Sequence, residues 1–122
     1  MGESILVLED EPDVLNVVCT ILEDAGYNAL GITSPDRVEE ALGSVTPNLF
    51  LMDIMLQGRS GIDVARALRA EGFPKTPMIA MSASPAMAGY ARSSGVFDET
   101  IDKPFDLSHL LETVERHLQV RA

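Results

Sequence analysis

The chain has 122 residues, 46% apolar and 23% charged, and its nine basic and nineteen acidic side chains give a net charge of −10 at pH 7. This composition excludes intrinsic disorder, and the length suits one globular domain. The negative charge argues against direct binding of nucleic acid or an anionic membrane. A single cysteine and the lack of a leader-like or membrane-spanning apolar segment indicate a cytoplasmic protein.

The first predicted element is a strand at residues 5–8, a solid apolar run typical of strands covered on both faces. A helix follows, because apolar residues recur at helical spacing between Pro12 and Gly26, residue types that mark helix starts and ends. Within this helix, Cys19 has apolar neighbours, which favours a small core residue over a reactive thiol.

A weaker strand is predicted at residues 28–32. Ser34 and Pro35 then supply an N-cap and a first-turn proline for a second helix, whose apolar residues continue to Val45. Another solid apolar run, at residues 49–52, predicts a further strand covered on both faces.

The third helix is predicted between Ser60 and Gly72. Ser60 with Asp63 three residues later resembles a capping box, although aspartate replaces the usual glutamate. The next solid apolar run, at residues 78–81, is again typical of a strand that is buried on both faces.

Ser84 and Pro85 open a fourth helix, which we expect to be short or mobile because Gly89 and paired serines lower its helix propensity. A weak strand at residues 97–101 and a last helix, capped by Asp106 and carrying one apolar stripe, follow. Strand and helix thus alternate five times. This order predicts an α/β fold with a parallel sheet, right-handed crossovers and helices on both faces.

In such sheets, ligands bind beyond the C-terminal ends of the strands. Crowded carboxylates at that edge repel one another unless a cation compensates them. Oxygen ligands with room for water and a phosphoryl oxygen suit Mg²⁺ better than Ca²⁺, and Asp10 and Asp53 are the predicted ligands. The polar residues predicted at this edge are Glu9, Asp10, Asp53, Ser82 and Lys103.

Asp53 directly follows the apolar run at residues 49–52, a place where a merely solvated acid is not needed, although a turn cap is an alternative. It could ligate a metal only, or it could act as a nucleophile toward a phosphoryl group. Lys103 and Ser82 favour the second role, since an ammonium and a hydroxyl stabilise the equatorial oxygens of a transferring phosphoryl group.

The motifs VLEDEP, LFLMDIML, MSAS and DKPF, in this order and spacing, resemble the receiver domain of two-component response regulators. The resemblance covers nearly the whole chain and implies that residues 1–122 form a single receiver (response regulatory) domain. The implied fold is a flavodoxin-like, doubly wound, five-stranded parallel sheet in the order 2-1-3-4-5 with five helices. A cis peptide bond between Lys103 and Pro104, frequent in this family, is also implied.

By the same resemblance, Asp53 accepts a phosphoryl group from a phosphohistidine of a sensor histidine kinase or a histidine phosphotransfer protein. Mg²⁺ is then held by Asp10, Asp53 and the backbone carbonyl of Met55, with Glu9 acting through water. The protein is a signalling phosphoacceptor that assists its own phosphorylation and dephosphorylation, not an enzyme, and its output passes to a downstream effector protein or output domain. The residues implied to contact the phosphoryl group are Asp53, Ser82 and Lys103.

Thr100 stands where receivers usually have an aromatic ring that swings inward on activation, so their common switch is not expected here. One alternative is a degenerate receiver that binds partners independently of phosphorylation, but Asp53, Ser82 and Lys103 are intact. Another is a phosphatase or a small-molecule binder. Met55 stands where such a phosphatase needs a second aspartate, and acids stand where a nucleotide binder needs a glycine-rich loop.

Overall fold

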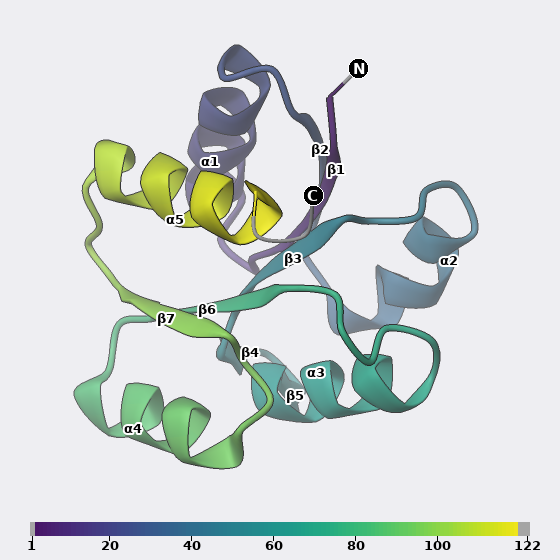
Figure 1. Cartoon of the computed structure of the whole chain (residues 1–122). Helices are drawn as coiled ribbons and strands as arrows, with labels where there is room; N and C mark the ends of the chain where they lie inside the picture. The colour runs from purple at the N-terminus through teal and green to yellow at the C-terminus, as the bar shows by residue number, and fades with distance from the viewer. Residues whose placement is uncertain (1, 120–122) are drawn as a thin grey trace.

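The computed structural model, which describes residues 2–119, contains a five-stranded parallel sheet (Figure 1). Its strands lie in the order β2-β1-β3-β6-β7. Numbered by themselves along the chain, they have the predicted order 2-1-3-4-5, so the flavodoxin-like α/β fold is confirmed. The strands are β1 (Ser4–Leu8), β2 (Asn28–Ile32), β3 (Leu49–Asp53), β6 (Met78–Ser82) and β7 (Glu99–Asp102).

Five α-helices cover this sheet in the described part of the chain, as predicted. Two of them, α1 and α5, lie on one face, and α2, α3 and α4 lie on the other (Figure 1). Across residues 2–119, no helix has both the length and the apolar character that crossing a membrane requires. The helices are α1 (Pro12–Asp24), α2 (Val38–Leu42), α3 (Gly61–Ala70), α4 (Pro85–Ser94) and α5 (Leu107–Gln119).

The sheet separates two apolar layers. The layer under α1 and α5 includes Val7, Leu51 and Ile79, and the layer under α2 and α3 includes Leu6 and Phe50. Successive residues of a strand point to opposite faces, so a strand between two layers must be apolar throughout. This explains why the central strands read as solid apolar runs in the sequence.

The second helical segment is shorter than predicted. It begins with a 3₁₀ turn at Pro35–Arg37, where the Ser34 hydroxyl accepts the backbone N–H two residues later at 3.2 Å. The following helix, α2, ends at Leu42, so the predicted extension to Val45 is wrong. Gly43 comes directly after α2, and its low helix propensity accounts for the early end.

The predicted caps of the other helices are largely confirmed. The Ser60 hydroxyl accepts the N–H of Ile62 at 3.1 Å, but Asp63 forms an ion pair with Arg66 at 3.8 Å, so the capping box is only half formed. Asp106 caps the last helix by accepting the N–H two residues later at 2.9 Å.

The fourth helix, α4, has ten residues, against thirteen in α1 and in α5. The hydroxyl of Ser84 accepts the N–H of Met87 at 3.3 Å at its start, and Gly95 ends it in a left-handed conformation with φ of 70°. Because α3 also has ten residues, α4 is short only relative to the two long helices. Its mobility stays a prediction.

A small antiparallel hairpin after β3 was not predicted. Its strands, β4 (Met55–Leu56) and β5 (Arg59–Ser60), have two residues each, too few to show an alternating pattern in the sequence. Gly58 has a φ of 81° in the turn between them, a conformation that glycine adopts without steric cost. The hairpin leads directly into α3.

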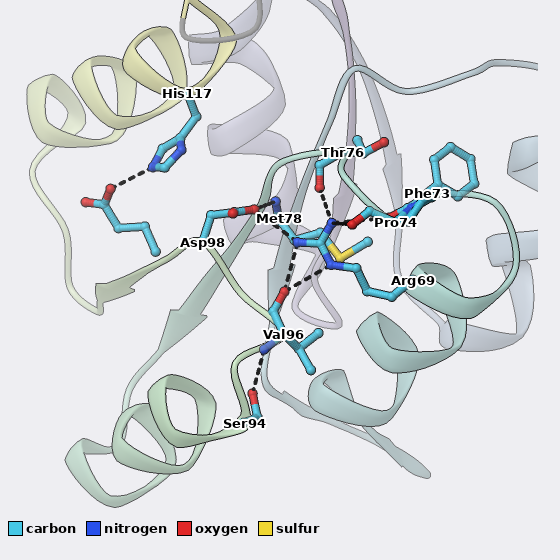
Figure 2. Close-up of polar contacts among 10 residues, drawn as sticks. Arg69, Phe73, Pro74, Thr76, Met78, Ser94, Val96, Asp98 and His117 are labelled. Atoms are coloured by element: carbon cyan, nitrogen blue, oxygen red, sulfur yellow. Dashed lines mark hydrogen bonds and ion pairs between the residues drawn. The ribbon is translucent and has the colours of Figure 1, made fainter.

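The guanidinium of Arg69, at the end of α3, joins two loops at the N-terminal edge of β6 (Figure 2). It donates to the backbone oxygen of Val96 at 2.9 and 3.2 Å and pairs with Asp98 at 3.0 Å. Asp98 also accepts the N–H of Met78 at 2.8 Å. We call this set the Arg69 cluster; its remaining acceptors are the backbone oxygens of Phe73, Pro74 and Thr76.

Two local predictions are confirmed. The peptide bond between Lys103 and Pro104 is cis. Cys19 is partly buried and packs against the apolar layer under α1 and α5.

Candidate functional site

Parallel strands bring distant residues together at their C-terminal ends. Glu9 directly follows β1, and its N–H donates to the backbone oxygen of Ile32 at 3.1 Å. Asp53 and Ser82 are the last residues of β3 and β6. Lys103 follows β7, and its N–H donates to the backbone oxygen of Ser82 at 2.7 Å. The predicted edge therefore exists and carries the predicted side chains.

Lys103 bridges two carboxylates at this edge. Its Nζ lies 2.9 Å from Oδ2 of Asp53 and also pairs with Oε1 of Glu9. Only 15% of the Lys103 side chain is exposed, and only 8% of that of Asp53. Burial alone would lower the pKa of the Lys103 ammonium, but the hydrogen bonds to Asp53 and Glu9 raise it above the ordinary lysine value. The Lys103 ammonium therefore stays protonated and positively charged at neutral pH.

Glu9 is fully buried, with both carboxylate oxygens engaged by the protein. Besides the pairing of Oε1 with Lys103, Oε2 accepts the N–H of Glu11 at 3.1 Å. Burial raises the pKa of the Glu9 carboxyl, and the hydrogen bond from Lys103 opposes this shift. The predicted role of Glu9, contact with a cation through water, stays a prediction.

Asp53 is held by the hairpin that follows it. Its Oδ1 accepts the N–H of Met55 at 3.0 Å, while Oδ2 faces Lys103. The chain returns to this point at Gly61, whose N–H donates to the backbone oxygen of Ile54 at 2.8 Å. A Cβ at Gly61 would lie 2.3 Å from the backbone oxygen of Asp53, so only glycine allows this close return.

The donor set at this edge fits a hard divalent cation. One carboxylate oxygen from each of Glu9, Asp10 and Asp53 lies within 4.8 Å of the others. Asp10 is partly exposed, and its carboxylate has no hydrogen bond or ion pair with any residue of 2–119. Oxygen ligands of this kind suit Mg²⁺. The backbone carbonyl of Met55 remains a predicted fourth contributor.

Ser82 is almost completely buried, and its hydroxyl is engaged locally. Its Oγ donates to the backbone oxygen of Ser84 at 2.8 Å and accepts the N–H of Ser84 at 3.1 Å. The hydroxyl thus bonds to the N-cap residue of α4, and its predicted contact with a phosphoryl group would require it to rotate. The sequence reasoning missed this pairing, although two serines separated by one residue are a known signal for such a local turn.

Thr100 lies partly buried in β7, opposite Ala80 of β6. The absence of the family's common aromatic switch here stays a prediction, based on the identity of this residue.

Comparison with known proteins identifies similar sequences. The chain is 34% identical to the nitrogen assimilation regulatory protein NtrX of Azorhizobium caulinodans, over 98% of this chain and 27% of that protein. It is 29% identical to the DNA-binding response regulator MtrA of Mycolicibacterium smegmatis, over 98% of this chain and 52% of that protein. The chain thus spans about a quarter to a half of the length of these relatives.

Solved structures with the same fold include NtrX from Brucella abortus, with a TM-score of 0.88 and 29% identity, over 98% of this chain and 27% of that chain. The receiver domain of the Francisella response regulator 1452 has a TM-score of 0.87 at 21% identity, over 99% of this chain and all (100%) of that chain. At 21% identity, the likeness to the Francisella domain shows the fold alone.

The sequence model of one family, the response regulator receiver domain, matches residues 5–115. This match includes every residue predicted at the strand edge, from Glu9 to Lys103. The chain belongs to the response regulator receiver domain family.

Proposed function

We propose that this receiver domain accepts a phosphoryl group on Asp53, from a phosphohistidine of a sensor histidine kinase or a histidine phosphotransfer protein, in a Mg²⁺-dependent step. The observation that carries the proposal is the buried Asp53 carboxylate, which lies 2.9 Å from the Lys103 ammonium and close to Asp10, a carboxylate with no hydrogen bond or ion pair within residues 2–119. A buried carboxylate with compensated charge can approach an anionic phosphoryl group, which an uncompensated one would repel.

In the proposed step, an oxygen of Asp53 forms a bond to phosphorus as the bond from phosphorus to the imidazole nitrogen breaks. The imidazole leaves with the electron pair of that bond and takes up a proton. Lys103, already 2.9 Å from Asp53, stabilises negative charge on the phosphoryl oxygens. The Ser82 hydroxyl donates to one of these oxygens after leaving Ser84, which makes Ser82 the residue that senses the modification.

Mg²⁺ bound by Asp10, Asp53 and the Met55 carbonyl would supply further positive charge beside the transferring group. Asp10 fits this role because its carboxylate is free of hydrogen bonds and ion pairs within the described chain. Asp53 fits because each of its oxygens accepts one hydrogen bond and keeps a lone pair for a ligand.

The domain is proposed to be a phosphoacceptor and not an enzyme with a separate substrate. Its output would pass through protein contacts to a downstream effector protein or an output domain, as the longer relatives suggest. With nineteen acidic and nine basic residues, the domain itself would not contact nucleic acid or a membrane. The proposed location is the cytoplasm, where its kinase partner's phosphohistidine is available.

The test is incubation with acetyl phosphate and Mg²⁺, followed by intact-mass measurement. The protein should gain the mass of one phosphoryl group, and the gain should disappear in Asp53→Asn or when EDTA removes the cation. Asp63→Asn, which removes an exposed carboxylate on α3, is the matched control and should keep the gain. A folded protein that gains no mass would instead favour a phosphorylation-independent interaction module, and a gain that survives in Asp53→Asn would show that Asp53 is not the acceptor.

A further inference from the structure

A groove of about 530 Å³ lies between α2 and α3, on the face of the sheet that these helices cover (Figure 1). Its two walls differ in length. At a rise of about 1.5 Å per residue, the five residues of α2 span about 7.5 Å, half the length of the ten residues of α3. The short helix therefore leaves space along its neighbour.

The floor of the groove is apolar and continuous with the layer under α2 and α3. Phe73, which follows α3, packs edge-on against Phe50 of β3 with ring centroids 5.0 Å apart. Phe73 and Leu42 are only partly buried, so apolar surface of the core reaches solvent here. The apolar residues of the floor include Val38, Leu42, Val64, Ala67, Leu68 and Phe73.

The rim of the groove is acidic. Asp36 lies in the 3₁₀ turn before α2, Glu39 lies in α2, and Glu71 follows α3 on the other wall. All three are exposed, and none of their carboxylates has a hydrogen bond or an ion pair within residues 2–119. The other acids of α2 and α3, Glu40 and Asp63, instead pair with arginines at 3.4 and 3.8 Å. The acids without a counter-charge in this region are thus those at the groove.

The charge of the rim decides which kind of molecule fits the groove. Arg59, in β5, is the basic lining residue, so three acidic side chains face one basic side chain. A second copy of this chain, with its net charge of −10, would be repelled, and so would nucleic acid or an anionic membrane. A protein helix with one apolar face and flanking Lys or Arg residues complements both the floor and the rim.

We propose that the groove between α2 and α3 is a docking site for a basic amphipathic helix of a partner protein. The helix would lie along α3 where α2 is too short to reach, with its apolar face on the floor and its basic residues beside Glu39 and Glu71. The inference goes beyond the proposed function, because the groove contains none of the polar residues of the strand edge and is present whether or not Asp53 is phosphorylated.

The probe for the experiment is a helical peptide of about 15 residues, with leucines at helical spacing on one face and lysines on both sides of them. One control peptide has glutamates in place of the lysines, and another has glutamines in place of the leucines. Isothermal titration calorimetry measures binding to the unphosphorylated protein, and backbone amide NMR shifts locate it.

The lysine peptide should bind with a dissociation constant below about 100 µM, at least about tenfold tighter than either control peptide, with the largest shifts in α2 and α3. Glu39→Gln with Glu71→Gln should weaken binding by about fivefold. Glu112→Gln with Glu115→Gln removes the same charge from exposed positions of α5 and should change binding by less than about twofold. Ala67→Arg, which fills the floor, should weaken binding by about tenfold or more.

Three results would overturn the proposal. The first is no binding of the lysine peptide at about 1 mM, or shifts centred outside α2 and α3. The second is an equal loss in the two double variants, since binding would then follow the net charge of the chain. The third is equal affinity for the lysine and glutamate peptides, which would assign the groove to an uncharged apolar ligand.

Shifts at the groove that grow with protein concentration alone would also overturn the proposal, because they would assign the groove to a second copy. If Ala67→Arg does not fold, the double variant of Glu39 and Glu71, which leaves the floor intact, decides. No phosphodonor or Mg²⁺ is present in these measurements, so their outcome is independent of whether Asp53 accepts a phosphoryl group.

Discussion

At the scale of single residues, the site is a set of charges that compensate one another inside the protein. Lys103 balances part of the charge on Glu9 and Asp53, and Asp10 is left for an external cation. A buried pair of this kind is a weak source of stability, since the desolvation of its members offsets their attraction. Its value lies in fixing the positions of the groups.

The thiol of Cys19 provides a separate test at this scale. Burial, with Glu23 nearby, raises the pKa of the Cys19 thiol. Alkylation by iodoacetamide at about pH 8.5 should therefore be at least about tenfold slower in the folded protein than in the same chain unfolded in urea. Because the folded pKa lies above the unfolded one, the stability that this shift contributes is complete below about pH 8.5 and is lost as pH rises through the folded value.

A double variant, Cys19→Ser with Ser93→Cys, moves the thiol to an exposed position on α4 and is the matched control. Its thiol should react at nearly the same rate in the folded and unfolded states. Equal rates for Cys19 itself in the two states would show that its burial does not protect it.

The residues of the site could be predicted from the sequence, but their pairing could not. Strand ends are visible as the points where solid apolar runs stop, so Asp53 and Ser82 were placed correctly. Lys103 and Glu9 are 94 positions apart, and their contact depends on the rotamers of two long side chains. The engagement of Ser82 by Ser84 was likewise hidden, since it depends on the direction of one hydroxyl.

At the scale of elements, the short hairpin after β3, the end of α2 and the loops before β6 and β7 are features that the apolar pattern does not predict. Helices and strands were predicted because burial imposes periodicity on them. The strands β4 and β5, with two residues each, are too short for an alternation of apolar and polar residues. The early end of α2 follows from the low helix propensity of Gly43. The Arg69 cluster has no sequence signature, because most of the atoms that Arg69 contacts are backbone oxygens of other residue types.

Replacing Arg69 should have a large effect on stability. Arg69→Met keeps much of the apolar stem but removes the guanidinium donor from the backbone oxygens of Val96 and Thr76 and the ion pair from Asp98. We expect the free energy of unfolding in urea to fall by about 3 kcal/mol, as for other partly buried charged hydrogen-bond donors.

The matched control is Arg66→Met, one turn earlier on α3. Its side chain is 58% exposed and its only ion pair in the described chain, with Asp63, has a separation of 3.8 Å. The expected loss is below about 0.5 kcal/mol. Similar losses for the two variants would mean that the Arg69 cluster contributes no more than a surface ion pair does.

At the scale of the whole molecule, the fold gathers acidic side chains into a site for a cation that the unfolded chain lacks. The chain carries an excess of acidic residues, and three of its carboxylates converge at one edge of the sheet. The alternation of strands and helices predicted a parallel sheet with helices on both faces, whereas the strand order was implied by the resemblance to receiver domains. A cation that needs both Asp10 and Asp53 binds the folded chain, since these two acids lie far apart along an unfolded one.

Mg²⁺ should therefore raise the melting temperature. At ten times its dissociation constant, a ligand of the folded state alone adds about 1.4 kcal/mol, which corresponds to a shift of several degrees. Asp10→Asn should abolish most of this shift, whereas Glu11→Gln, which alters an exposed neighbour, should keep it. Differential scanning calorimetry at constant ionic strength measures the shift, and an equal response of both variants would point to general screening of charge.

The close return of the chain at Gly61 has one further consequence. The segment after Asp53 leaves the sheet, turns at Gly58 and comes back at Gly61, whose N–H donates to the backbone oxygen of Ile54. The hydrogen bond between Gly61 and Ile54 ties its two ends to each other, so a change at the exposed tip of the turn should leave the backbone of Asp53 in place. Such a segment is a natural place for related proteins to differ, and a graft of foreign residues at the turn would sit beside the site while leaving the sheet beneath it intact.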